Sequence, residues 1–149
     1  MHSPLLLIAD DDPALCRVLE VRCENLGLRA ISAHDAMHAL IIAHRQLPSI
    51  IIMDLAMPAG NGLSASEMLL DDARLGDVPI IIYSATACPE DVRRIRDLGL
   101  DFIPKSPDAW PAMRSAILRH LPQIHTGRTI KSRRAEHAAH HSTQPADRS

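Results

Sequence analysis

Short apolar runs in this sequence are each followed directly by polar residues whose types could do chemistry together. Carboxylates crowded into one place repel each other, and a hard divalent cation such as Mg²⁺ relieves that repulsion through oxygen ligands. An aspartate beside such an ion can act as an in-line nucleophile toward phosphorus. A lysine and a serine hydroxyl can stabilise the charge on phosphoryl oxygens. The residues concerned are Asp10, Asp11, Asp12, Asp54, Ser84 and Lys105.

These residues can meet only if the apolar runs are strands of one sheet. The runs are short and mostly rich in aliphatic residues, which predicts strands over residues 5–9, 28–32, 50–53, 79–83 and 101–104. The longer stretches between them predict helices over residues 13–26, 35–46, 63–74, 89–98 and 109–120. Strands that alternate with helices indicate an α/β fold, a parallel sheet with helices on both faces.

Apolar residues at helical spacing predict which helix faces are buried. In the first helix the expected core stripe is Leu15, Val18, Leu19 and Leu26. In the second helix the expected packing residues are Met37, Leu40, Ile41 and Ala43. The pair Asp12-Pro13 predicts the start of the first helix, since Asp is a good N-cap and Pro suits the first helical position.

The predicted sheet brings the polar residues to one edge. Ligands of doubly wound sheets bind at the carboxyl ends of the strands, where the strand order reverses. With strand order 2-1-3-4-5, the first and third strands are neighbours, so Asp10, Asp11 and Asp54 are expected to meet. Ser84 and Lys105 follow the fourth and fifth strands at the same edge. The sequence therefore predicts an aspartyl-phosphate site that uses Mg²⁺.

Four motifs in this order resemble those of the bacterial two-component response-regulator receiver domain. They are I-A-D-D-D-P, I-I-M-D-L-A-M-P, I-Y-S-A and F-I-P-K, and the resemblance covers about residues 4–121. It implies one (βα)5 flavodoxin-like domain over residues 1–121. It also implies that the domain takes part in phosphorelay signal transduction, as chemotaxis-type receivers do.

The resemblance assigns a role to each residue that matches a motif. Asp54 is implied to be the phosphoacceptor. Mg²⁺ is implied to bind directly to Asp11, Asp54 and the backbone carbonyl of Ala56, with Asp10 acting mainly through water. Lys105 is implied to pair with the phosphoryl oxygens.

Further residues of the family pattern concern switching and phosphoryl lifetime. Ser84 is implied to be the switch hydroxyl, and Phe102 matches the aromatic residue that rotates with it. Ala56 and Thr86 occupy the two variable positions that tune dephosphorylation in this family. The chain departs from the pattern after the lysine, where the family usually has a cis proline and this chain has Ser106. A cis bond before a residue other than proline costs about 3 kcal/mol.

The resemblance also implies partners. A histidine kinase or phosphotransfer protein would supply the phosphoryl group, and a downstream effector protein would read a surface around residues 89–98, 101–104 and 109–120. A homodimer through that surface is a further expectation. No DNA-binding domain and no membrane association are expected, and the protein is predicted to be no enzyme beyond its own phosphorylation and dephosphorylation.

Composition and charge argue against several classes of protein for this chain. The net charge of −2 gives no general attraction to nucleic acid or membranes. The three cysteines, Cys16, Cys23 and Cys88, show no spacing typical of a disulfide framework or a zinc site. The apolar run that ends at Ala9 is too short for a signal peptide or a membrane span, so a cytoplasmic location is expected.

The last part of the chain differs in composition from the rest. Residues 1–124 carry 11 Lys and Arg against 16 Asp and Glu, a net charge of −5, whereas residues 125–149 carry 5 against 2, a net charge of +3. We expect residues 122–149 to be a solvated His- and Arg-rich tail. Histidines 137, 140 and 141 could hold a metal if helical, and the basic residues could meet an acidic partner, but both roles are the less favoured readings.

Other functions remain open at this stage. A degenerate receiver that works as a binding module without phosphorylation is the main alternative. A phosphohydrolase of the haloacid-dehalogenase type would use Asp10 and Asp12, but Ala14 does not fit its motif and Asp54 would be unexplained. A flavodoxin-like nucleotide-binding role is disfavoured because no Gly-rich or Ser/Thr-rich loop follows the first strand.

Overall fold

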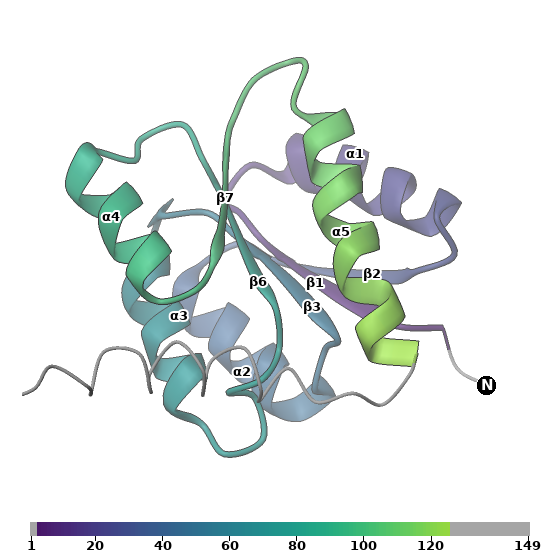
Figure 1. Cartoon of the computed structure of the whole chain (residues 1–149), viewed down its shortest axis with the longest axis horizontal. Helices are drawn as coiled ribbons and strands as arrows, with labels where there is room; N and C mark the ends of the chain where they lie inside the picture. The colour runs from purple at the N-terminus through teal and green to yellow at the C-terminus, as the bar shows by residue number, and fades with distance from the viewer. Residues whose placement is uncertain (1–2, 126–149) are drawn as a thin grey trace, which may run out of the picture.

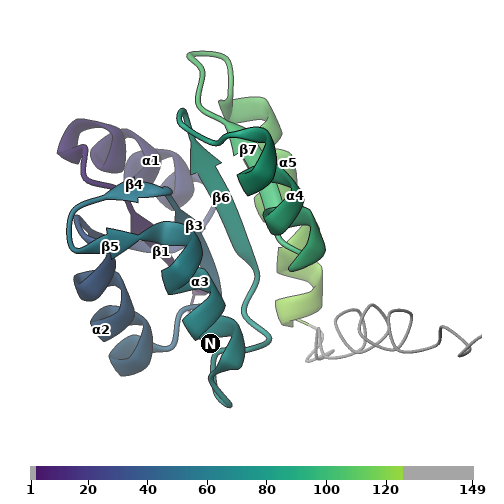
Figure 2. The same cartoon turned by 90° about the vertical axis from the view of Figure 1, so that its left-hand side faces the viewer.

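The computed structural model describes residues 3–125 as a five-stranded parallel sheet covered by helices on both faces (Figures 1 and 2). The strand order is β2-β1-β3-β6-β7, which confirms the predicted order of the five main strands. The strands are β1 (Leu5–Ala9), β2 (Arg29–Ala33), β3 (Ile50–Met53), β6 (Ile80–Ser84) and β7 (Asp101–Pro104). The helices are α1 (Pro13–Asn25), α2 (Ala36–Gln46), α3 (Gly62–Asp71), α4 (Pro89–Asp97) and α5 (Trp110–His125).

The three central strands are apolar because both of their faces are covered. Every residue of β1, β3 and β6 is buried, and most are leucine or isoleucine. The register places Ala9 beside Met53 and Met53 beside Ile82, so these strands end at the same edge of the sheet. The residues that follow them therefore come together there.

Each face of the sheet carries its own hydrophobic core. One core joins the sheet to α2, α3 and α4, with Leu69 and Ile95 among its buried residues. The other joins it to α1 and α5, through residues such as Leu19 and Ile117. Figure 1 shows α4 and α5 on either side of the edge strand β7.

The buried stripe of α1 differs from the prediction. Its buried residues are Cys16, Leu19 and Cys23, whereas Val18 is 49% exposed. Leu15 and Leu26 are only partly buried. The helix is rotated so that its cysteines face the sheet, and a free cysteine packs like a small apolar side chain.

The buried face of α2 also differs from the prediction in part. Ala43 is buried and Leu40 is partly buried, as expected, but Met37 and Ile41 are exposed. The residues against the sheet are Ala36, Ala39, Ile42 and Ala43. Three of these four are alanines, and small side chains let a helix lie close to the sheet.

A small antiparallel hairpin fills the loop between β3 and α3. It pairs β4 (Ala56–Met57) with β5 (Gly60–Asn61), where the sequence indicates only a turn. Asn61 then caps α3 by accepting a hydrogen bond from the Leu63 N–H at 2.7 Å. The hairpin therefore leads the chain from the end of β3 directly into α3.

Element boundaries otherwise differ by a few residues from the sequence-based expectation. α3 ends at Asp71 rather than near residue 74, and α5 runs on to His125 instead of stopping near residue 120. Residues 126–149, including the three tail histidines and the basic tail residues, lie outside the described part of the chain. None of the helices of residues 3–125 is both long and apolar enough to span a lipid bilayer.

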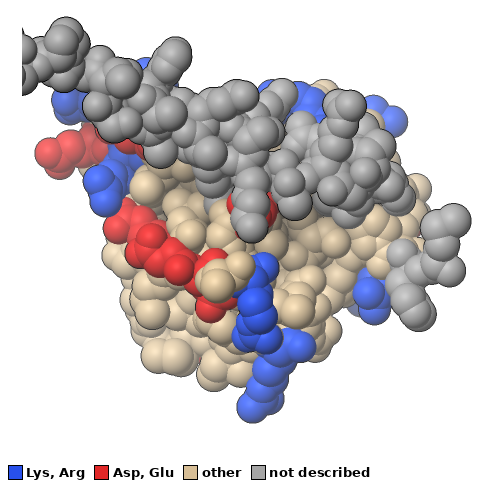
Figure 3. Space-filling view, turned by 60° about the horizontal axis from the view of Figure 1, so that its bottom comes forward, with Lys and Arg blue, Asp and Glu red and all other residues tan. Residues whose placement is uncertain are grey.

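Acidic and basic side chains form separate small groups on the surface that Figure 3 shows, with other residues around them. Red and blue side chains lie next to each other there, so neither sign of charge covers the whole of the visible coloured face. This mixed surface agrees with the small net charge of the chain.

Candidate functional site

Three aspartates meet where β1 and β3 end. Oxygen atoms of the Asp10, Asp11 and Asp54 carboxylates all lie within 4.8 Å of one another. Asp10 and Asp54 are buried, with 2% and 5% of their surface exposed, whereas Asp11 is exposed. The Asp54 N–H donates to the Ala9 carbonyl at 2.9 Å, so the β1–β3 pairing continues into the site.

The fourth aspartate of this region has another role. Asp12 is the N-cap of α1, and its carboxylate accepts hydrogen bonds from the N–H groups of Ala14 and Leu15. Its own N–H donates to the Asp10 carboxylate at 2.9 Å. The structure thus confirms Asp12 as the capping residue and leaves the other three aspartates to form the cluster.

Lys105 reaches this cluster from the end of β7. Its ammonium group lies 2.7 Å from an Asp10 oxygen and 3.0 Å from an Asp54 oxygen. Its backbone N–H donates to the Ser84 carbonyl at 3.0 Å, which extends the β6–β7 pairing by one step. The structure therefore brings Lys105 together with two of the predicted carboxylates, and Asp10 is the nearer one.

Burial and ion pairing shift the pKa values of Asp10 and Lys105 in opposite directions. Burial raises the pKa of Asp10 above its usual range, although the hydrogen bond from Lys105 acts in the other direction. Burial also favours the neutral form of Lys105, but its hydrogen bonds to Asp10 and Asp54 outweigh that effect and raise its pKa. The lysine is therefore held charged beside the aspartates.

Ser84 lies at the end of β6, and the residue is 1% exposed. Its hydroxyl is within 3.2 Å of the Thr86 hydroxyl, and it accepts a hydrogen bond from the Thr86 N–H, also at 3.2 Å. Ser84 thus stands at the predicted edge of the sheet, and its hydroxyl is bound to a neighbour that sequence reasoning noted only as a variable position.

The two remaining predicted positions, Phe102 and Ala56, lie in β7 and in the β4–β5 hairpin. Phe102 is partly buried in the middle of β7, where it packs against the core shared by α2, α3 and α4. Ala56 lies in the β4–β5 hairpin two residues after Asp54, and its side chain is exposed. Its backbone therefore remains near the carboxylates without a polar side chain of its own.

The sequence leaves the backbone geometry after Lys105 open, and the structure shows it. No peptide bond among residues 3–125 is cis, so the Lys105–Ser106 bond is trans. This avoids the cost of a cis bond before serine. Lys105 nevertheless contacts both Asp10 and Asp54.

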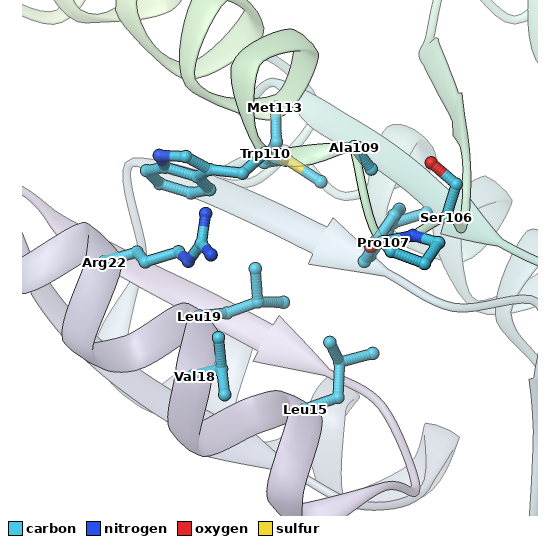
Figure 4. Close-up of a pocket in the computed structure, with 10 residues that line it drawn as sticks. Leu15, Val18, Leu19, Arg22, Ser106, Pro107, Ala109, Trp110 and Met113 are labelled. Carbon is cyan, nitrogen blue, oxygen red and sulfur yellow. The ribbon is translucent and has the colours of Figure 1, made fainter.

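A pocket of about 150 Å³ lies between α1 and α5 (Figure 4). Leu15 and Val18 line it from α1, and Trp110 and Met113 line it from α5. The Arg22 guanidinium lies 5.1 Å from the centre of the Trp110 ring and joins the two helices there.

One aromatic ring links this pocket to the charged site. Tyr83 lines the pocket, and the Lys105 ammonium lies 5.8 Å from the centre of its ring. Tyr83 is buried, and burial raises the pKa of its hydroxyl. This contact could not be predicted from the sequence, since only the fold shows which way Tyr83 points from β6.

Sequence reasoning also missed two residues that contact the first aspartate. The carbonyl oxygen of Asp10 lies 3.1 Å from His34 Nδ1 and 3.4 Å from the Cys16 sulfur. His34 directly follows β2, so the rule that selected the other site residues would have included it. Cys16 carried no such signal, because it lies in the first turns of α1.

The donor set of the cluster fits a hard cation. Three carboxylates lie within reach of one point, and Mg²⁺ prefers carboxylate oxygens while it keeps some of its water. A cation there would also offset the repulsion among the three aspartates. The described residues thus include an acidic pocket suited to Mg²⁺.

Comparison with known proteins agrees with this geometry. The profile of the response regulator receiver domain matches residues 6–113. The chain is 31% identical over 133 residues to "Probable transcriptional regulator ycf27" of Porphyridium aerugineum, which covers 87% of this chain and 54% of that protein. It is 28% identical to "Polar-differentiation response regulator DivK" of Brucella anthropi, covering 78% of this chain and 94% of that protein. The chain spans about half the length of its ycf27 relatives.

Solved structures have the same fold. A response regulator receiver protein from Pseudomonas putida has a TM-score of 0.74 at 25% identity, covering 80% of this chain and 98% of that one. The chemotaxis response regulator CheY4 of Vibrio cholerae has a TM-score of 0.72 at 19% identity, covering 80% and 99%, which speaks for the fold alone. The haloacid-dehalogenase and flavodoxin alternatives have no support from these matches. With a sheet of the predicted order and a profile match over most of its length, this chain belongs to the response regulator receiver domain family.

Proposed function

We propose that this chain is a phosphoryl-accepting receiver of a phosphorelay, with Asp54 as the phosphoacceptor and Mg²⁺ as its cofactor. The observation that carries the proposal is the surroundings of Asp54. Its buried carboxylate lies at the end of β3, 3.0 Å from the Lys105 ammonium and within 4.8 Å of Asp10 and Asp11 oxygens. This combination supplies a nucleophile, a cation and a metal site in one place.

The chemistry assigned to the chain's own residues is a single displacement at phosphorus. A lone pair of an Asp54 oxygen forms the new P–O bond, and the bond from phosphorus to the donor group breaks with its electron pair going to the donor. When bound by Asp11, Asp54 and the Ala56 carbonyl, with Asp10 acting through water, Mg²⁺ would neutralise charge on the phosphoryl oxygens. Lys105 would pair with another of these oxygens.

Ser84 and Phe102 would couple phosphorylation of Asp54 to a change in the surface formed by α4, β7 and α5. In this proposal the Ser84 hydroxyl leaves Thr86 and donates to a phosphoryl oxygen. Phe102 then changes its packing on β7, and α4, β7 and α5 present a changed surface. Phosphorylation can shift this equilibrium only by the difference in its interaction with the two conformations.

The proposal extends to partners and location. A histidine kinase or a phosphotransfer protein would donate the phosphoryl group, and an effector or a second copy would bind the α4–β7–α5 surface. The described residues would act in the cytoplasm as the phosphoryl-accepting part of a response regulator. Its only catalysis would be its own phosphorylation and dephosphorylation.

The test is phosphorylation by acetyl phosphate, followed by intact mass. We expect a phosphoryl adduct that requires Mg²⁺ and is absent from Asp54→Asn and greatly reduced in Asp11→Asn. Asp12→Asn is the matched control, since it removes a neighbouring charge outside the cluster and asparagine can still cap α1. That variant should be phosphorylated like the wild type.

Two results would count against the proposal. An adduct that persists in Asp54→Asn would place the phosphoryl group elsewhere. Absence of an adduct would be followed by beryllofluoride, a stable mimic of the phosphoryl group. If the folded protein binds neither, the chain is a receiver-like binding module that works without phosphorylation.

A further inference from the structure

The backbone carbonyl of Asp10 is held by two side chains that no part of the proposed mechanism uses. Its oxygen lies 3.1 Å from His34 Nδ1 and 3.4 Å from the Cys16 sulfur. A carbonyl oxygen can only accept hydrogen bonds, so we assign the His34 proton to Nδ1 and the Cys16 thiol as the second donor, although the Cys16 sulfur also lies 3.9 Å from His34 Nδ1. The two lone pairs of this oxygen then both have a partner.

The His34 side chain continues the β1–β2 hydrogen bonding by one step beyond the end of β2. In a parallel pair, the N–H and C=O of one residue point to the same neighbouring strand. The Asp10 N–H donates to the Ala33 carbonyl at 3.0 Å, so the Asp10 carbonyl also points toward the chain after β2. β2 ends at Ala33, and the His34 side chain supplies the donor that the next backbone N–H would otherwise supply.

The carbonyl of the Asp10–Asp11 peptide is consequently held by two side chains. His34 holds it from the end of β2, and Cys16 holds it from the buried face of α1. The preceding Ala9–Asp10 peptide is held on both sides, because the Asp54 N–H donates to the Ala9 carbonyl and the Asp10 N–H donates to the Ala33 carbonyl. These bonds set the orientation of the peptide from which Asp11 projects.

Asp11 depends on this backbone for its position. Within residues 3–125, its exposed carboxylate makes no hydrogen bond or ion pair with another side chain, in contrast to Asp10 and Asp54, which Lys105 holds. A metal ligand placed only by its backbone loses its geometry when that backbone moves. Groups that orient metal ligands in this way contribute to metal affinity without touching the ion.

We propose that His34 is a positioning residue for the Mg²⁺ site, acting through the Asp10 carbonyl, with Cys16 as a weaker second donor. This inference rests on the proposed function, because it takes the acidic cluster to be a metal site. The role requires a donor at the position of Nδ1 and requires nothing of the other ring nitrogen.

Three substitutions separate that donor from the rest of the ring. His34→Asn keeps an N–H donor at the position of Nδ1, His34→Gln moves the donor one bond further out, and His34→Ala removes it. We expect the Ala and Gln variants to bind Mg²⁺ about three- to tenfold more weakly, as for the loss of one hydrogen bond, and the Asn variant to stay within about twofold of the wild type. His34 is exposed, so water can replace part of the lost bond and should keep the change below tenfold.

The measurements are Mg²⁺ titration by calorimetry, with no phosphoryl donor present, and thermal unfolding of the metal-free protein. A purely structural role would lower the unfolding temperature of His34→Ala and leave the Mg²⁺ dissociation constant unchanged. Cys16→Ala should weaken Mg²⁺ binding less than His34→Ala does, since a thiol is a weak donor.

Asp11→Asn distinguishes failure of this inference from failure of the proposed function. If Mg²⁺ does not bind the wild type, or binds Asp11→Asn equally well, the metal site and this inference are both wrong. If Asp11→Asn loses Mg²⁺ but His34→Ala does not, only the role of His34 is wrong. Equal weakening in His34→Asn and His34→Ala would also overturn it, since the donor would then not be the cause.

Discussion

At the scale of single residues, the positive charge of Lys105 offsets the negative charges of Asp10 and Asp54 in the site. Lys105 contacts Asp10 at 2.7 Å and Asp54 at 3.0 Å, and its side chain is only 21% exposed. Without a metal, this ammonium group is the positive charge that offsets the two buried carboxylates. Lys105 should therefore stabilise the metal-free fold as well as the phosphoryl group.

Replacing Lys105 by methionine tests this double role. Methionine keeps the length of the apolar stem, so the loss is mainly that of the charge. We expect the metal-free variant to lose about 1–3 kcal/mol of unfolding free energy, between the values for exposed and buried ion pairs. Mg²⁺ should then raise the stability of Lys105→Met more than that of the wild type.

Urea unfolding with and without Mg²⁺ measures both effects. Lys105→Arg is the control, because it keeps a positive charge and should lose less stability. A Lys105→Met variant as stable as the wild type without metal would show that the lysine does not offset the aspartates.

At the scale of elements, the start of α3 is packed directly on the end of β3. A β-carbon added to Gly62 would lie 1.8 Å from the Asp54 carbonyl oxygen, and the Gly62 N–H donates to the Leu55 carbonyl at 2.9 Å. Only glycine lets α3 begin this close to the phosphoacceptor. The position of α3 and that of Asp54 are therefore linked.

Gly62→Ala should disturb both the fold and the site. The clash involves backbone atoms that cannot turn away, so we expect a loss of roughly 3 kcal/mol of unfolding free energy, at the upper end for overpacking. Phosphorylation by acetyl phosphate should slow in the fraction that remains folded. Gly27→Asn is the control, because Gly27 has φ 86° with open space around it and asparagine tolerates that region.

Thermal unfolding and intact mass check this prediction. If Gly62→Ala unfolds at the same temperature as the wild type, α3 can shift away from β3 without cost. The close contact would then not fix the position of Asp54.

The strands were predictable because burial on both faces leaves a clear pattern. Runs such as Leu5–Ala9 and Ile50–Met53 are uniformly apolar and are stopped by aspartates, which gave both their extent and the location of the site. The lysine could be placed for the same reason, since the residue after each parallel strand reaches the same edge.

The helix faces and the contacts around the site were less predictable. In α1 the sequence offers Leu15 and Val18 as well as the cysteines, and only docking against the sheet decides that Cys16 and Cys23 face inward. The hydrogen bond of His34 to the Asp10 carbonyl depends on where β2 ends relative to β1. Neither the buried face of α1 nor this hydrogen bond can be predicted from the local sequence alone.

At the scale of the whole molecule, two cores enclose the sheet, and the one shared by α1 and α5 buries two of the three thiols. Burial raises the pKa of Cys16 to about 11 and that of Cys23 to about 12. Cys88 is exposed at the start of α4. The cysteines thus report on the integrity of the fold.

Near neutral pH we expect one thiol per chain to react quickly with Ellman's reagent. Thiolate is the reactive form, so a raised pKa leaves Cys16 and Cys23 protonated and slow, in addition to their burial. Cys88→Ser should abolish the fast phase, and denaturant should expose the two slow thiols together. A fast phase that persists in Cys88→Ser would show that α1 leaves the sheet readily.

The pocket between α1 and α5 gives the molecule an optical reporter of its own. Trp110 is the only tryptophan of the chain, and it stacks with Arg22 across the pocket, whereas Tyr83 is the aromatic residue of the pocket that lies near Lys105. The indole therefore senses the spacing of two helices rather than the phosphoryl site itself. A change of Trp110 emission on binding of beryllofluoride would show that the conformational change reaches the contact between α1 and α5. No attached dye is needed for this measurement.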